Sequence, residues 1–316
     1  MTSKKTIYDV IVIGGGPAGL AASLYTSRRT LKTLLITKDV GGQTILTTKI
    51  ENYPGIDLID GITLTQNFVK QAEKHGLENI GYEVTKVEKL NEHFEVSANG
   101  TKYKSRALII AFGLEHRHLG VPGEIKLTGR GVSYCATCDA PLFRGKDVAI
   151  VGGGNSALDA AILLSKIAND VTVIHRADGF RADEITQDKI RNSKNITTMM
   201  ESQVTEVKGD TTVKSIIVTN NKTRKETELY LDGVFIEIGY VAKTEWLKGL
   251  VDLNKHGEVI VDKNSQTSTA GIFAAGDITD INHKQIVIAA GQGATAALEA
   301  YKYLAKMKGT ETPDWN

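Results

Sequence analysis

Two stretches of the sequence decide the fold: IYDVIVIGGGPAGLAA at residues 7–22 and VAIVGGGNSALDAA at residues 148–161. Each begins with a run of apolar, mostly β-branched residues that is typical of a buried strand, and each continues into a glycine-rich turn and a helical apolar pattern. The spacing of the turn is Gly-x-Gly-x-x-Gly in the first copy and Gly-x-Gly-x-x-Ala in the second. These small residues permit a tight turn, a close approach of the backbone to a pyrophosphate, and close packing of helix on strand.

Both copies are completed by a second strand, at 33–37 and 171–174, and in the second copy we expect a helix over 157–168. The spacing is the same in the two copies, 23 residues from Gly14 to Thr37 and from Gly152 to His175. One such motif is weak evidence, but two with matched spacing predict two dinucleotide sites. The fold class is therefore α/β, with two Rossmann-like, three-layer dinucleotide-binding domains. Two such sites in one chain are typical of a flavoprotein that takes hydride from a nicotinamide.

Composition excludes several classes of partner. The chain has 316 residues, enough for about two domains, and 38 Lys plus Arg oppose 37 Asp plus Glu, for a net charge of +1. This balance suggests neither a nucleic-acid nor a membrane partner. The apolar run at 10–13 is too short for a signal peptide, and no stretch approaches the roughly 18 apolar residues of a membrane span. We therefore expect a cytoplasmic protein.

Both cysteines of the chain lie in one Cys-Ala-Thr-Cys sequence, Cys135 to Cys138. A secreted disulfide scaffold would carry more cysteines, so the pair indicates redox chemistry or metal binding. One Cys-x-x-Cys supplies only half of a tetrahedral zinc site, and none of the 7 histidines stands at zinc spacing close by. We expect no metal. The pair can also lie at the start of a helix, where a thiolate is favoured.

The end of the closing strand indicates which nucleotide each copy binds. In the second copy this position begins His175-Arg176, with Arg181 following, so cations replace the carboxylate that would bind a ribose 2′-hydroxyl. This favours NADPH over NADH, although an ordinary basic surface loop would read the same way.

The first copy has Thr37-Lys38 at the corresponding point, so its assignment to FAD depends on TAGIFAAGD at 269–277. There we expect a strand over 272–275, a turn at Gly276, and in Asp277 a carboxylate for the ribityl or phosphate region of the flavin. Lys284, Gln285 and a helix over 285–305 follow. The positive end of such a helix suits the flavin pyrimidine, where reduction builds negative charge.

Seven motifs together resemble the low-molecular-weight thioredoxin reductases, in the same order and over nearly the entire chain: GGGPAGLAA, GGQ at 41–43, ENYPG at 51–55, CATCD at 135–139, GGGNSA at 152–157, HRADGFR at 175–181 and FAAGD at 273–277. The resemblance implies a split FAD domain at 1–116 and 248–316, an inserted NADPH domain at 117–247, and a homodimer. It also implies that the inserted domain rotates on linkers around 113–123 and 239–247.

The resemblance also implies the site residues. FAD would be bound by Gly14, Gly16, Pro17, Ala18, Gly19, Gly42, Gln43, Asn52, Gly113, Gly276, Asp277, Lys284, Gln285 and Ile286. NADPH would be bound by Gly152, Gly154, Asn155, Ser156, Ala157, His175, Arg176 and Arg181. Cys138 would be the thiol nearest the flavin, Cys135 the thiol that attacks the partner's disulfide, and Asp139 the acid or base. The partner would be thioredoxin or a thioredoxin-like disulfide protein.

Three departures from the family pattern stand out. Ala177 replaces the second of two arginines, which weakens the expected preference for NADPH, and Phe112 stands where the family usually has threonine. After Asp139 the sequence 140–143 resembles the family only loosely. In similar proteins paired aromatic residues at this place contact thioredoxin, so the identity of the partner stays open.

Four other classes compete with this interpretation. An oxygen-dependent dithiol oxidase of similar fold needs no NADPH, which the second glycine motif and His175-Arg176 argue against. A ferredoxin-type NADP reductase would lack the cysteine pair. A nucleotide-binding module without enzymatic activity would have no use for CATCD between two dinucleotide sites. The reductases of peroxide systems share this core but carry an added amino-terminal disulfide domain, which we do not expect here.

Overall fold

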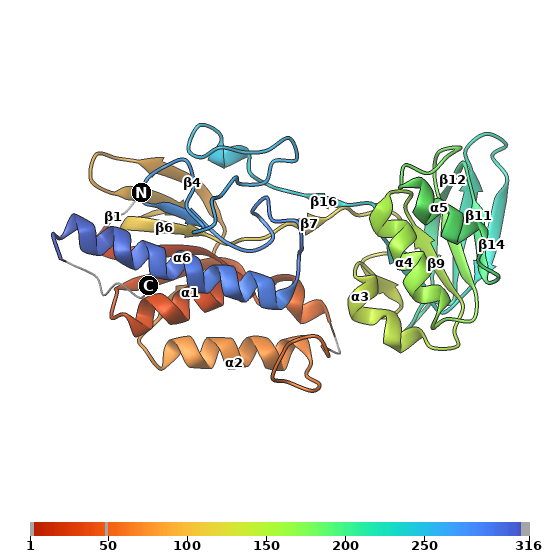
Figure 1. The fold of residues 1–316 in the computed structure, drawn as a ribbon, viewed down its shortest axis with the longest axis horizontal. Helices are drawn as coiled ribbons and strands as arrows, with labels where there is room; N and C mark the ends of the chain where they lie inside the picture. Colours follow the sequence, from red (N-terminus) through yellow and green to blue (C-terminus); the bar gives the residue numbers. More distant parts are fainter. Residues whose placement is uncertain (1–2, 48–49, 311–316) are drawn as a thin grey trace. The chain divides into compact units, whose positions relative to one another are not determined.

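The computed structural model describes residues 3–47 and 50–310. The chain divides into two compact units, the first built from residues up to 45, 50–115 and from 241 onward, the second on residues 116–240. The sequence placed these boundaries after residues 116 and 247, and the outer limits of that prediction, residues 1 and 316, lie outside the described residues. A two-stranded ribbon of β7 (Glu115–His116) and β16 (Tyr240–Val241) lies where the chain passes between the units (Figure 1).

The first unit is built on one large sheet. Its strands run in the order β3 (Glu78–Ile80), β2 (Thr33–Val40), β1 (Ser3–Gly15), β6 (Thr101–Ile110), β5 (Phe94–Ala98), β4 (Val84–Lys89), and β17 (Ile272–Ala274) also pairs with β6. The pairs joining β3, β2, β1, β6 and β17 are parallel, whereas β4, β5 and β6 form an antiparallel meander. One face carries the helices α1 (Pro17–Arg28), α2 (Gly61–Glu73) and α6 (Ile286–Met307) (Figure 1).

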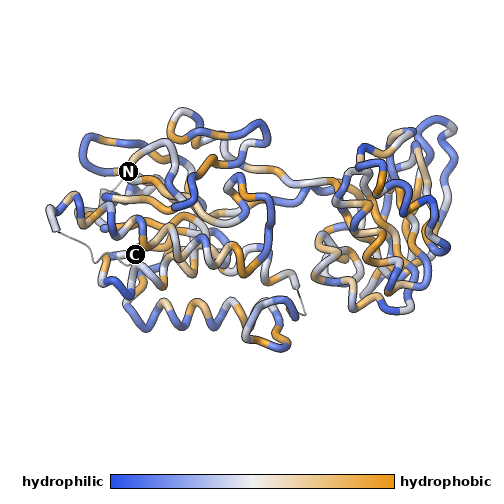
Figure 2. Tube along the Cα trace, in the orientation of Figure 1, coloured by the Kyte–Doolittle hydropathy of each residue, from blue (hydrophilic) through white to orange (hydrophobic). Residues whose placement is uncertain are grey.

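The alternation of side chains along β1 explains why this sheet is buried on both faces. Val10 and Val12 pack with the helices α1 and α6, whereas Ile11 and Ile13 pack with the meander on the other face. Residues on a strand alternate between faces, so a continuous apolar run such as 10–13 serves a sheet covered on both sides. Figure 2 shows the same concentration of hydrophobic residues along the central strands of each unit.

The second unit repeats the three-layer arrangement on a smaller scale. Its five strands are all parallel, in the order β11 (Ile196–Met199), β10 (Val171–Ile174), β9 (Val148–Val151), β15 (Gly233–Ile236), β8 (Val132–Ser133). One face packs against α4 (Asn155–Ser165), α5 (Glu184–Arg191), α3 (Ala136–Asp139) and the short helix η2 (Ala140–Phe143). The other face packs against an antiparallel sheet of β12 (Ser202–Lys208), β13 (Ser215–Asn220) and β14 (Glu226–Tyr230).

The predicted α/β class with two Rossmann-like domains is confirmed. The predicted strands at 148–151 and 171–174 coincide with β9 and β10, and the helix predicted from residue 285 is α6. The bounds of the helix predicted over 157–168 were wrong: the observed helix, α4, begins at Asn155 and ends at Ser165. Beyond Ser165 the bond from Ile167 N–H to the Leu164 carbonyl (2.9 Å) tightens the chain into a turn, although the apolar pattern continues.

Candidate functional site

The first glycine turn, between β1 and α1, contains the three backbone geometries that the motif predicts. Gly14 has φ +108°, and a Cβ there would lie 2.4 Å from the Phe112 Cα. A Cβ on Gly19 would lie 1.8 Å from the Gly14 carbonyl oxygen, so helix and strand touch at this point. A Cβ on Gly16 would meet no atom within 4 Å. The first and third glycines are therefore required by packing, whereas the second leaves space open to a ligand.

The start of α1 also offers unpaired donors. Its N-cap is Gly16, which has no side chain to cap the helix, and its first turn carries Pro17 and Ala18 but no acid. The neighbouring α2 differs, because its N-cap Asp60 accepts a hydrogen bond from Thr63 N–H. Free first-turn N–H groups and the positive end of the helix dipole together favour an anion such as a phosphate.

The carboxyl-terminal segment meets this turn directly. Gly276 follows β17 with φ +79°, and a Cβ there would lie 2.8 Å from the Ala18 Cβ. Within α6, a Cβ on Gly293 would lie 2.0 Å from the Ala18 carbonyl oxygen. Ala18 is buried by these contacts. The structure thus brings together the first motif and the FAAGD segment, which lie more than 250 residues apart in the sequence.

Two predicted cofactor residues of this segment have clear surroundings. Asp277 is partly buried, and loss of solvation raises its pKa to about 6, with Lys284 acting in the opposite sense and Glu258 adding to the rise. The Lys284 ammonium donates to the carbonyls of Asp277 (3.0 Å) and Thr279 (2.6 Å) and pairs with Glu258 at 3.1 Å. Lys284 therefore binds its own loop, and this fixes the approach to α6.

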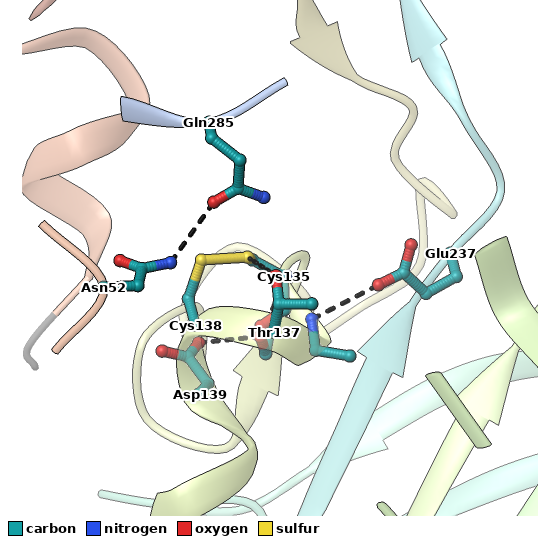
Figure 3. Close-up of a disulfide and its surroundings, with 9 residues drawn as sticks. Asn52, Cys135, Thr137, Cys138, Asp139, Glu237 and Gln285 are labelled. Atoms are coloured by element: carbon teal, nitrogen blue, oxygen red, sulfur yellow. Dashed lines mark hydrogen bonds between the residues drawn. A yellow bond between two sulfur atoms is a disulfide. The ribbon is translucent and has the colours of Figure 1, made fainter. Parts of the chain in front are cut away.

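The other predicted residues of the first unit form a second set of contacts. Gln285 is the N-cap of α6, whose first residue is Ile286, and the Gln285 side chain accepts a hydrogen bond from Asn52 at 3.2 Å (Figure 3). Gln43 donates to the Leu114 carbonyl. A Cβ on Gly42 would lie 3.5 Å from the Gly16 Cα, which places the 3-10 turn η1 (Gly42–Leu46) against the first motif. Gly113 has φ +69° and open space around its Cα.

The second glycine turn, between β9 and α4, has the same construction. A Cβ on Gly152 would lie 2.6 Å from the Ala157 Cβ, whereas one on Gly154, the N-cap of α4, would meet nothing within 4 Å. Asn155 and Ser156 form the exposed first turn of α4. The Asn155 side chain exchanges two hydrogen bonds with Asp183, one to its carboxylate (3.1 Å) and one from its N–H (2.8 Å).

The three predicted phosphate donors behave differently from one another. Arg176 and Arg181 are exposed, and Arg181 N–H donates to the Gly153 carbonyl at 2.7 Å. His175 is only 5% exposed and packs against Phe180 and so closely against Gly153 that a Cβ there would overlap its ring. Burial and the two arginines lower the pKa of His175. The imidazole is thus neutral near pH 7 and supports the glycine turn, while the two arginines are the available cations.

The cysteine pair forms a disulfide at the beginning of α3 (Figure 3). Cys135 is the N-cap residue, and its carbonyl accepts hydrogen bonds from Cys138 N–H (3.2 Å) and Asp139 N–H (3.1 Å). The expectation that the pair lies at a helix start is confirmed. Both cysteines are partly exposed.

A hydroxyl links the predicted acid to the first cysteine. Ser133, at the end of β8, accepts a hydrogen bond from Cys135 N–H at 3.1 Å and donates its own proton to the Asp139 carboxylate at 2.7 Å. Burial raises the pKa of Asp139, and the bond from Ser133 partly offsets the rise. A carboxyl with a raised pKa is suited to take up and release a proton.

Two of the three departures from the family pattern have structural explanations. Phe112 packs against Trp246, with ring centroids 5.4 Å apart, and both rings are partly buried against the core of the first unit. Phe143 is 7% exposed and packs edge-on against Phe235 at 5.0 Å. The aromatic side chain after Asp139 is therefore a core residue of the second unit.

Sequence reasoning missed Ser133 and Glu237. Nothing in the sequence distinguishes Ser133 as a functional residue, because a hydroxyl residue two positions before a cysteine is common. Glu237 gave a weak signal, since it directly follows the buried strand β15. Its carboxyl accepts a hydrogen bond from Ala136 N–H at 3.3 Å, and burial raises its pKa to about 7.

Comparison with known proteins agrees with this geometry. The family model described as pyridine nucleotide-disulphide oxidoreductase matches residues 8–293. A thioredoxin reductase structure from Streptococcus pyogenes matches with a TM-score of 0.89 and 40% identity, covering 96% of this chain and 100% of that one. The chain therefore belongs to the pyridine nucleotide-disulphide oxidoreductase family. FAD and NADPH are the cofactors that this membership implies.

Two curated relatives are longer proteins. An NADH dehydrogenase of Bacillus subtilis and one of the subunits of an alkyl hydroperoxide reductase of Staphylococcus aureus are each 41% identical over 303 residues. These matches cover 96% and 95% of this chain, which spans about 60% of the length of either relative. In the part of the chain that the structure describes, no helix has the length and apolar character needed to cross a membrane.

Proposed function

We propose that this protein is an NADPH-dependent thioredoxin-disulfide reductase. The observation that carries the proposal is the disulfide at the start of α3, joined through Ser133 to a carboxyl with a raised pKa, within a dinucleotide-binding unit. Full-length similarity to a thioredoxin reductase supports it. Bound NADPH and FAD would supply the electrons that reduce the Cys135–Cys138 disulfide, and the resulting dithiol passes them to a thioredoxin-like protein disulfide.

The open space at Gly16 and Gly154 and the uncapped first turns of α1 and α4 fit a pyrophosphate in each unit. In the first unit the FAD would be held by the glycine turn, Asp277 and the start of α6, with the loops of Gln43 and Asn52 beside them. In the second unit Arg176 and Arg181 would bind the 2′-phosphate of NADPH. When bound, these cofactors supply the hydride and the two electrons that reduce the disulfide.

The reaction with the partner is a thiol–disulfide exchange. The Cys135 thiolate attacks one sulfur of the partner's disulfide, which forms a mixed disulfide and releases the partner's other sulfur as a thiolate. Cys138 then attacks the Cys135 sulfur, so the Cys135–Cys138 bond forms again and the partner leaves as a dithiol. Two electrons and two protons have moved to the partner. Asp139 holds and delivers a proton as thiolate becomes thiol.

Three further assignments belong to this proposal. Residues 1–116 and 248–316 form the FAD domain and 117–247 the NADPH domain, which rotates between two poses. In one pose the nicotinamide reaches the flavin, and in the other the cysteine pair does. The protein works as a cytoplasmic homodimer.

A second candidate comes from the relative that belongs to an alkyl hydroperoxide reductase. A protein of that kind would use the same cysteine chemistry but would pass its electrons to a different disulfide protein. The two candidates therefore share the site and differ in the partner.

An anaerobic titration of the purified protein with NADPH, and separately with NADH, tests the site. We expect an uptake of about four electrons per chain, two for FAD and two for the disulfide. A plateau near two electrons would show that Cys135 and Cys138 have no redox contact with the flavin. Capture with a Cys138→Ser variant then tests the partner. We expect Cys135 to trap a thioredoxin, and a peroxidase component trapped instead would favour the second candidate.

A further inference from the structure

Glu237 lies where an apolar residue would be expected. It directly follows β15, whose four residues are all buried, and its backbone N–H donates to the Val151 carbonyl at 2.8 Å. Glu237 thus continues the pairing of β15 with β9 at the carboxyl edge of the sheet. Among the described residues no cation pairs with its carboxyl. Glu237 is partly buried, and a carboxyl withdrawn from water without a counter-ion is costly, so a specific contact is needed to explain its place.

That contact is with the peptide that follows Cys135. Oε1 of Glu237 accepts a hydrogen bond from Ala136 N–H, the first N–H of α3, at 3.3 Å (Figure 3). First-turn N–H groups have no partner within their own helix. On the other side, Ser133 accepts from Cys135 N–H. The two peptide groups that flank the Cys135 Cα are therefore held by different elements, β8 through Ser133 and β15 through Glu237.

We propose that Glu237 is a positioning residue for Cys135: its carboxyl holds the Cys135–Ala136 peptide against the sheet and controls how readily the Cys135 thiol ionises. This inference rests on the proposed function, in which Cys135 is the exchanging thiol. It adds a second carboxyl to the redox site, provided by the nucleotide-binding sheet and not by the cysteine motif.

The direction of the effect follows from electrostatics. A thiolate at the N-cap is stabilised by the positive end of its helix. A carboxylate at the same helix end is a like charge and disfavours the thiolate, whereas a neutral carboxyl does not. The carboxyls that the structure places around α3 are Glu237 at its start and Asp139 at its end. Of these two carboxyls, that of Glu237 accepts the hydrogen bond from Ala136 N–H, whereas that of Asp139 accepts from the Ser133 hydroxyl.

The test isolates Cys135 in a Cys138→Ser background and compares the parent with Glu237→Gln and Glu237→Ala. The readout is the pKa of the Cys135 thiol, measured from the pH dependence of alkylation by iodoacetamide. Glutamine keeps the acceptor for Ala136 N–H and removes the charge. We expect the thiol pKa of this variant to fall by about half a unit, so that alkylation near pH 7 becomes about threefold faster. The exposed Glu226→Gln, on β14 of the same unit, is the matched control and should leave the thiol pKa unchanged.

Each outcome has a defined meaning. A thiol pKa in Glu237→Gln equal to that of the parent would overturn the inference. Glu237→Ala removes both charge and contact, so we expect alkylation of Cys135 with a pH profile unlike that of Glu237→Gln; identical profiles would overturn the positioning role. Circular dichroism and thermal unfolding establish that each variant is folded. If Cys135 exchanges with thioredoxin disulfide but its thiol pKa is the same in the parent and in the Glu237 variants, only this inference fails. If Cys135 reacts in no variant, the proposed function fails with it.

Discussion

At the scale of single residues, this protein combines motif residues with carboxyls whose protonation is controlled by burial. Asp139, Glu237 and Asp277 all have raised pKa values, and burial is the largest cause in each case. Buried acids are unfavourable for stability and useful for proton transfer. Because these acids lie at the redox helix and beside the first glycine turn, they indicate functional sites better than exposed charged residues do.

The role of Asp139 predicts a selective kinetic defect. We expect Asp139→Asn to slow reoxidation of the Cys135–Cys138 dithiol by the partner about a hundredfold, because the amide can neither hold nor deliver the proton that the exchange requires. Reduction of the flavin by NADPH should change much less. Stopped-flow measurement of the two half-reactions separates these effects, with the exposed Asp210→Asn as a control. Equal slowing of both half-reactions would contradict the role.

The raised pKa of Asp277 predicts a stability that depends on pH. In the folded protein its pKa is about 6, above the ordinary value of 3.8, so folding favours the protonated form. The contribution is complete at low pH and is lost as pH rises through 6. Asp277→Asn avoids this loss, and without cofactor we expect it to be more stable than the parent by about 2 kcal/mol at pH 8. Thermal unfolding at pH 4.5 and 8 checks this. A variant destabilised equally at both values would contradict it.

At the scale of elements, two strand–turn–helix units supply the same kind of site twice. In each turn one small residue, Gly19 or Ala157, lies where the helix packs against the strand. Another, Gly16 or Gly154, has no atom within 4 Å of the position that a Cβ would take. The uncapped first turns of α1 and α4 differ from α2, which is capped by Asp60. The same elements therefore serve stability at one position and ligand binding at the next.

This division predicts opposite effects of alanine at two glycines. Gly154→Ala adds a methyl group where the structure has open space, at a φ of −97° that alanine adopts readily. We expect little change in thermal stability but a KM for NADPH raised about tenfold, since the methyl occupies the approach to the pyrophosphate. Gly19→Ala, with its Cβ 1.8 Å from a carbonyl oxygen, should instead lower the melting temperature by several degrees. Unchanged nucleotide binding in Gly154→Ala would locate the pyrophosphate elsewhere.

At the scale of the whole molecule, one unit is inserted into the other, and the chain passes between them through the ribbon of β7 and β16. Around this passage His116 stacks between Tyr134 and Tyr240, with ring centroids 4.9 and 4.7 Å apart. Burial lowers the pKa of His116 to about 4, so the stack is uncharged at neutral pH. It anchors the linker strands within the second unit.

Rotation of the inserted domain predicts that joining the units stops turnover. We expect a bifunctional amine reagent that links a lysine of each unit to reduce turnover with NADPH and thioredoxin at least tenfold, because one of the two poses is lost. Peptide mapping identifies the molecules so linked, and a monofunctional reagent of the same chemistry is the control. Full turnover in the linked molecules would show that no rotation is needed.

Local patterns of apolar residues, glycines and cysteines are enough to predict the two nucleotide-binding units, the strands β9 and β10, and the redox pair at a helix start. The residues that surround these features were set by the folded structure. It buried His175 against Gly153, turned Phe143 into the core, set Ala18 against Gly276, and brought Glu237 to the peptide after Cys135. These contacts join residues far apart in the chain, and their partners are chosen by the packing of strands and helices, which a local pattern does not encode.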